Sequence, residues 1–96
     1  MATKQPLLDD TCNVLAELIA FPTVSADSNV ELITYAAEQL GRCGASLTIS
    51  RDESGSKANL FATIGPEGDG GIVLSGHTDV VPAEPEEWTG DPFAMR

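Results

Sequence analysis

The sequence predicts an α/β fold in which two helices are followed by three strands. Up to about residue 41, the apolar residues recur at helical spacing. From residue 46 onward, apolar and polar residues alternate, which is typical of strands. A short continuous apolar run, Ile72-Val73-Leu74, then predicts a strand that is buried on both faces. This order of elements favours helices packed on a sheet.

The first predicted helix begins near Pro6 and ends at Ala20. Proline suits the first turn of a helix, because its missing N–H would have no partner there. The apolar residues of this segment form one stripe, Leu8, Cys12, Leu15, Leu18 and Ile19. Phe21 precedes Pro22, and a residue before proline disfavours the helical conformation, so the helix should stop at this point.

The second predicted helix begins after a loop at residues 22–27. Ser28 and Glu31 have the spacing of a capping box, in which each side chain accepts a hydrogen bond from the other residue's free backbone N–H. The buried stripe of this helix should consist of Val30, Ile33, Ala37 and Leu40. Gly41 and Gly44 are candidate terminators, because glycine adopts the left-handed conformation at little cost.

Three strands should follow the helices. Leu47 and Ile49 alternate with polar residues, which predicts a half-buried strand over residues 46–50. Turn-forming residues at 52–56 separate it from a second strand over residues 59–64. A glycine-rich link then leads to the third strand at Ile72-Val73-Leu74.

Charge and composition exclude several classes of partner. The 96 residues include 15 acidic and 5 basic side chains, for a net charge of -10, and no basic cluster that could neutralise phosphates. No apolar run approaches the roughly 20 residues that span a bilayer, and the first residues do not resemble a secretory signal. Cys12 and Cys43 lie in unrelated contexts. We expect a cytoplasmic protein with reduced cysteines that binds neither nucleic acid nor membrane.

The candidate functional residues follow the third predicted strand, in the segment Ser75–Pro82. Ligands of open α/β sheets bind outside the carboxyl ends of strands, and Gly76 leaves room for close approach. His77 and Asp79 are two residues apart, so their side chains share one face of an extended segment. The Asp79 carboxylate can then accept a hydrogen bond from one ring nitrogen and leave the other free to bind a metal. For a lone histidine, a purely structural role is the commoner alternative.

Ser75–Pro82 resembles the first metal-site motif of the M20 family of zinc peptidases and deacylases. The likeness extends to Glu87-Trp88 and Asp91-Pro92-Phe93 after the motif, and to Phe21–Ser25 before it. The resemblance implies that residues 1–96 are the truncated N-terminal segment of a catalytic domain. It implies that His77 binds one of two zinc ions, with Co²⁺ as an alternative metal, and it counts Asp79, which orients His77, among the catalytic residues.

By the same resemblance, the parent protein is a metal-dependent amidohydrolase that removes an acyl group from a small N-acyl amino acid, and it forms a homodimer. The family's bridging aspartate, glutamate base and remaining ligands lie later in its sequence, so we expect the 96-residue segment to be inactive alone. Another deacylase or peptidase of the family is one alternative. A non-catalytic binding or regulatory module that retains this fold segment is the other.

Overall fold

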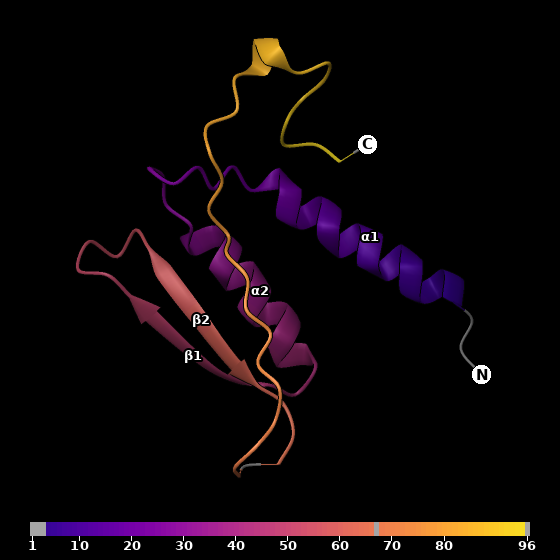
Figure 1. The fold of residues 1–96 in the computed structure, drawn as a ribbon, viewed down its shortest axis with the longest axis vertical. Helices are drawn as coiled ribbons and strands as arrows, with labels where there is room; N and C mark the ends of the chain where they lie inside the picture. Colours follow the sequence, from indigo (N-terminus) through magenta and orange to yellow (C-terminus); the bar gives the residue numbers. More distant parts are fainter. Residues whose placement is uncertain (1–3, 67, 96) are drawn as a thin grey trace. The chain divides into compact units, whose positions relative to one another are not determined.

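The computed structural model describes residues 4–66 and 68–95. Its elements, shown in Figure 1, are α1 (Lys4–Ala20), α2 (Val30–Arg42), β1 (Ser46–Arg51), β2 (Ala58–Thr63) and a short 3-10 helix, η1 (Pro85–Glu87). The chain divides into two compact units. One unit is Thr23–Val80, which contains α2 and both strands, and the other is formed by the residues before and after it.

Helix α1 ends at the predicted residue. Ala20 is its last residue, and the Phe21 backbone N–H donates to the Leu18 carbonyl at 3.2 Å, just before Pro22. The predicted apolar stripe is only partly covered, because Leu8 and Leu15 remain 54% and 48% exposed. In the described parts of the chain, no helix combines the length and the apolar character that crossing a membrane requires.

Helix α2 begins at Val30, one residue later than a cap at Ser28 would place its start. Asn29, rather than Ser28, occupies the N-cap position and makes no side-chain cap hydrogen bond. The Ser28 hydroxyl accepts a hydrogen bond from the Val30 backbone N–H instead, at 3.2 Å. The predicted capping box between Ser28 and Glu31 is therefore wrong. At the other end, α2 stops at Arg42, and Gly44 has the positive φ of 86° expected of a terminating glycine.

The strands β1 and β2 form an antiparallel hairpin that packs on α2. Ile49 lies opposite Leu60, and Leu47 lies opposite Ala62, so these four side chains share one face of the hairpin. The buried apolar residues of the described chain come from α2 and the start of β2: Leu32, Ile33, Ala37 and Ala58. The prediction of the α2 stripe missed Leu32. Strand β1 is more exposed than predicted, because α2 covers its apolar face incompletely.

The third predicted strand, Ile72-Val73-Leu74, is wrong. In the described residues the sheet has two strands, and residues 72–79 have no regular secondary structure. Figure 1 shows this segment as an extended trace without a strand arrow. Its three apolar side chains are 78–92% exposed. An apolar run indicates a segment suited to burial, but a strand forms only where a neighbouring backbone pairs with it. The α/β character is retained, with two antiparallel strands in place of three.

Asn29 joins α2 to β2. Its side-chain Nδ2 donates to the Ala58 carbonyl at 2.9 Å, and its Oδ1 accepts from the Ala58 backbone N–H at 2.8 Å. Nδ2 also donates to Thr78 Oγ1 at 3.4 Å. This bond joins the motif segment, Ser75–Pro82, to the same point. Asn29 and Ala58 are only 9% and 4% exposed. One amide thus satisfies both backbone groups of a buried strand residue, as a neighbouring strand would.

Replacing Asn29 should destabilise this unit. In Asn29→Ala, both buried backbone groups of Ala58 lose their partner, so the free energy of unfolding should fall by about 1–3 kcal/mol for each unsatisfied group. Urea denaturation followed by circular dichroism measures the change. Asn59→Ala, at an exposed asparagine of β2, is the matched control and should lower stability by less than about 0.5 kcal/mol. Equal effects of the two substitutions would contradict the anchoring role of Asn29.

The hairpin turn should make stability depend on pH through Asp52. The Ser54 hydroxyl, which donates to Asp52 Oδ1 at 2.8 Å, is the largest cause that lowers the pKa of Asp52 below its ordinary 3.8. A lowered folded-state pKa contributes stability above pH 3.8 that is lost as the pH falls through the folded pKa. Ser54→Ala should raise the Asp52 pKa, as measured by carboxyl NMR titration, while Ser46→Ala leaves it unchanged. An unchanged pKa in Ser54→Ala would contradict this assignment.

Candidate functional site

The motif segment is held by a short pairing with the loop before α2. The Val80 backbone N–H donates to the Thr23 carbonyl, and the Ser25 N–H donates to the Val80 carbonyl, both at 3.0 Å. These bonds form an isolated parallel bridge between Val24 and Val80. The buried Thr23 side chain adds a hydrogen bond from Oγ1 to the Thr78 carbonyl at 2.6 Å. The loop before α2 therefore holds the segment that carries His77 and Asp79, although the two segments are about 55 residues apart in sequence.

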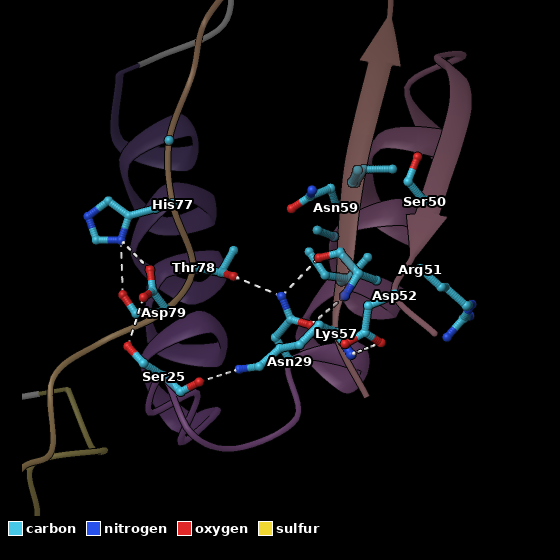
Figure 2. Close-up of a pocket in the computed structure, with 15 residues that line it drawn as sticks. Ser25, Asn29, Ser50, Arg51, Asp52, Lys57, Asn59, His77, Thr78 and Asp79 are labelled. Carbon is cyan, nitrogen blue, oxygen red and sulfur yellow. Dashed lines mark hydrogen bonds and ion pairs between the residues drawn. The ribbon is translucent and has the colours of Figure 1, made fainter. Parts of the chain in front are cut away.

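The predicted contact between His77 and Asp79 is present. Figure 2 shows the His77 ring facing the Asp79 carboxylate, with Nδ1 3.1 Å from Oδ1. The same Nδ1 lies 2.9 Å from the backbone carbonyl oxygen of Asp79. The expected setting at the end of a strand is not present, because the segment before the motif pairs with neither strand of the sheet. The metal-binding and orienting roles of the two residues stay predictions.

The partners of His77 Nδ1 determine which ring nitrogen carries the hydrogen. A carbonyl oxygen and an ionised carboxylate oxygen are acceptors only, so Nδ1 must donate to both. In the neutral ring, Nε2 is then the unprotonated nitrogen with a free lone pair. The His77 side chain is 84% exposed, which leaves this ring accessible. The ring is thus exposed, with Nδ1 turned toward two acceptor oxygens.

The contact between Ser25 and Asp79 is one that sequence reasoning missed. Its hydroxyl donates to Asp79 Oδ2 at 2.8 Å, on the carboxylate oxygen that His77 does not contact. This hydrogen bond is the largest cause that lowers the pKa of Asp79 below its ordinary 3.8, and the adjacent His77 ring lowers it further. Ser25 lies within the Phe21–Ser25 stretch that carries the family resemblance. That resemblance was the one available signal, and it does not indicate a contact across 54 residues.

Lys57 holds the loop that presents Ser25. Its Nζ donates to the Ser25 carbonyl at 2.7 Å and to the Asp27 carbonyl. Because Lys57 directly precedes β2, the hairpin supports the loop from the side opposite the motif segment. Ser25 is therefore fixed through its own backbone at both its N–H and its carbonyl group.

A pocket of about 770 Å³ lies between the motif segment and the hairpin, over α2. His77 and Asp79 line one side of it, and Arg51, Lys57 and Asn59 of the hairpin region line the other. This volume is within the range of about 300–1,000 Å³ that is usual for small-molecule sites. Within the described ranges, no group of three or more His, Cys, Asp or Glu side chains is placed to hold a metal ion. Among the residues that line the pocket, the His77 imidazole has the chemistry of one zinc ligand.

The chain is similar to curated proteins named acetylornithine deacetylase. It is 43% identical over 86 residues to the one from Proteus mirabilis (strain HI4320), a match that covers 82% of this chain and 22% of the relative. It is 42% identical over 86 residues to the protein from Photorhabdus laumondii, with the same coverage. The protein from Shigella sonnei (strain Ss046) is 39% identical over 85 residues, covering 81% of this chain and 22% of the relative.

The likeness covers most of this chain and a small part of each relative. No family model matches the chain, and no solved structure matches it. The chain spans about a fifth of the length of the curated relatives it matches. The predicted resemblance to a deacylase is confirmed at the level of sequence: over about four fifths of its own length, this chain is similar to acetylornithine deacetylases.

Proposed function

We propose that this chain is the N-terminal part of the catalytic domain of an acetylornithine deacetylase, where it supplies one metal-binding histidine and the carboxylate that orients it. The reaction would convert N-acetylornithine and water to ornithine and acetate, within arginine synthesis. The observation that carries the proposal is the exposed His77 ring, whose Nδ1 faces the Asp79 carboxylate and carbonyl oxygens. Identities of 39–43% to proteins of that name support it.

Each of the two residues has a defined task in this proposal. Asp79 accepts the Nδ1 hydrogen, holds the ring in one tautomer and increases the electron density at Nε2. His77 Nε2 would bind one of two zinc ions, with cobalt as an alternative metal. Zinc, when bound, supplies Lewis-acid polarisation of the amide carbonyl and of the attacking water.

The remaining ligands and the general base would come from parts of the parent protein that this chain does not contain. A catalytic zinc usually has three protein ligands, and the described residues offer one prepared imidazole. Succinyl-diaminopimelate desuccinylases share the motif resemblance, but the relatives found here are named deacetylases, which favours the acetylated substrate. A homodimeric parent protein in the cytoplasm completes the proposal.

The chain by itself should bind zinc weakly and hydrolyse no N-acetylornithine. Complete structural zinc sites bind with about 10–16 kcal/mol, and a single imidazole supplies a small part of that free energy. Isothermal titration calorimetry with zinc chloride should give a Kd weaker than about 10 μM. His77→Ala should remove this binding, whereas Asn59→Ala should retain it. Tight binding that survives His77→Ala would reveal another metal site and contradict the assignment of His77.

The catalytic roles can be tested in a chimera in which this chain replaces the matching segment of the Proteus mirabilis relative. The chimera should release ornithine from N-acetylornithine. Asp79→Asn fills the same space without the charge, so it should reduce turnover or zinc affinity by about 10–100-fold while the chimera stays folded. Ser46→Ala, at an exposed serine of β1, should change neither.

Two outcomes would contradict the proposed function. A folded, zinc-loaded chimera without turnover would show that this segment does not serve deacetylation. Equal turnover and zinc content in the Asp79→Asn and unsubstituted chimeras would remove Asp79 from the mechanism.

A further inference from the structure

We propose that Ser25 is a positioning residue of this site: its hydroxyl fixes the rotation of the Asp79 carboxylate and thereby selects the tautomer of His77. The importance of this for metal binding rests on the function proposed above. The hydrogen bonds themselves belong to the 96-residue chain and can be tested without any metal.

The Asp79 carboxylate has a different partner on each oxygen. Oδ1 faces His77 Nδ1 at 3.1 Å, and Oδ2 accepts the Ser25 hydroxyl at 2.8 Å (Figure 2). The terminal torsion of an aspartate side chain is broad and weakly restricted on its own. Because the Asp79 side chain is 55% exposed, packing does little to restrict it. The bond to Ser25 is therefore the contact that keeps Oδ1 turned toward the ring.

Ser25 can hold the carboxylate because its own position is held from two sides. Its backbone N–H donates to Val80 O at 3.0 Å, and its carbonyl accepts from Lys57 Nζ at 2.7 Å. The hydroxyl has a single hydrogen and two acceptors within reach, Asp79 Oδ2 at 2.8 Å and Val80 O at 3.3 Å. The shorter contact to a charged oxygen is the stronger one. The serine hydrogen is therefore directed to Asp79.

The effect of Ser25 can be separated from that of the backbone. His77 Nδ1 also faces the Asp79 carbonyl oxygen at 2.9 Å, and this contact needs no serine. If the carbonyl alone selected the tautomer, removing the Ser25 hydroxyl would have no effect on the ring. If the carboxylate is required, its release should allow the Nε2–H tautomer to populate. The tautomer ratio of His77 thus distinguishes a positioning serine from one that only stabilises the loop.

The measurement is made on the full 96-residue chain by ¹⁵N NMR of the imidazole nitrogens, without metal. His77 is the single histidine of the sequence, so the two ring signals need no assignment. A neutral imidazole carries one hydrogen, so the two ¹⁵N shifts report which ring nitrogen holds it. We expect one protonated Nδ1 and one unprotonated Nε2 in the unsubstituted chain. In Ser25→Ala, the two ¹⁵N shifts should move toward each other as the second tautomer appears.

Three further variants make the outcome decisive. Ser25→Thr keeps the hydroxyl and should retain the tautomer, whereas Asp79→Ala should lose it, and Ser46→Ala should leave it unchanged. Backbone amide spectra show whether each variant is folded. If Ser25→Ala is unfolded, Ser25→Cys provides the same comparison with a weak donor of similar shape.

The result that overturns the proposal is a folded Ser25→Ala chain with the unsubstituted chain's ratio of tautomers. This result would leave the proposed deacetylase function intact, because the Asp79 carbonyl would then orient the ring. Conversely, tautomer loss in Ser25→Ala together with an inactive chimera would support the positioning role and contradict the function.

Discussion

The side-chain amide of Asn29 is the interaction on which the unit Thr23–Val80 depends. It gives β2 a hydrogen-bonding partner at Ala58 and reaches Thr78 in the motif segment, from a residue that directly precedes α2. Three segments that are distant in sequence are thereby joined at one buried point. Among the described residues, four apolar side chains are buried, so the satisfied hydrogen bonds of Asn29 add to the specificity of a small core.

The candidate site also depends on a small number of contacts. The parallel bridge between Val24 and Val80 aligns two loops, and the polar side chains on those loops then meet. Ser25 and His77 each contact one oxygen of the same carboxylate, while Lys57 supports the loop from the hairpin. Because the bridge, rather than a regular sheet, sets this alignment, the position of Asp79 depends on a few individual hydrogen bonds.

The contacts of His77 and Asp79 set the geometry of the proposed metal ligand. In the proposed function, His77 binds the metal through Nε2 while Nδ1 faces its two acceptors, and the pocket beside the ring has the size of a small-molecule site. The similarity to acetylornithine deacetylases gives this arrangement a chemical context. In that proposal, the described residues provide one ligand, and a functional metal pair needs further ligands.

The sequence by itself determined the local features of this protein. Helical spacing identified both helices, Pro22 marked the end of α1, alternation and turn residues identified the hairpin, and the spacing of His77 and Asp79 predicted their contact. These features depend on residues that are close in the chain. Partners across long sequence separations were decided by the tertiary structure alone. Ile72-Val73-Leu74 is as apolar as a buried strand but pairs with neither strand of the described sheet, the Asn29 side chain bonds to Ala58, and Ser25 meets Asp79. Local patterns specify which segments suit burial or hydrogen bonding, whereas the choice of partner depends on how distant segments meet in three dimensions.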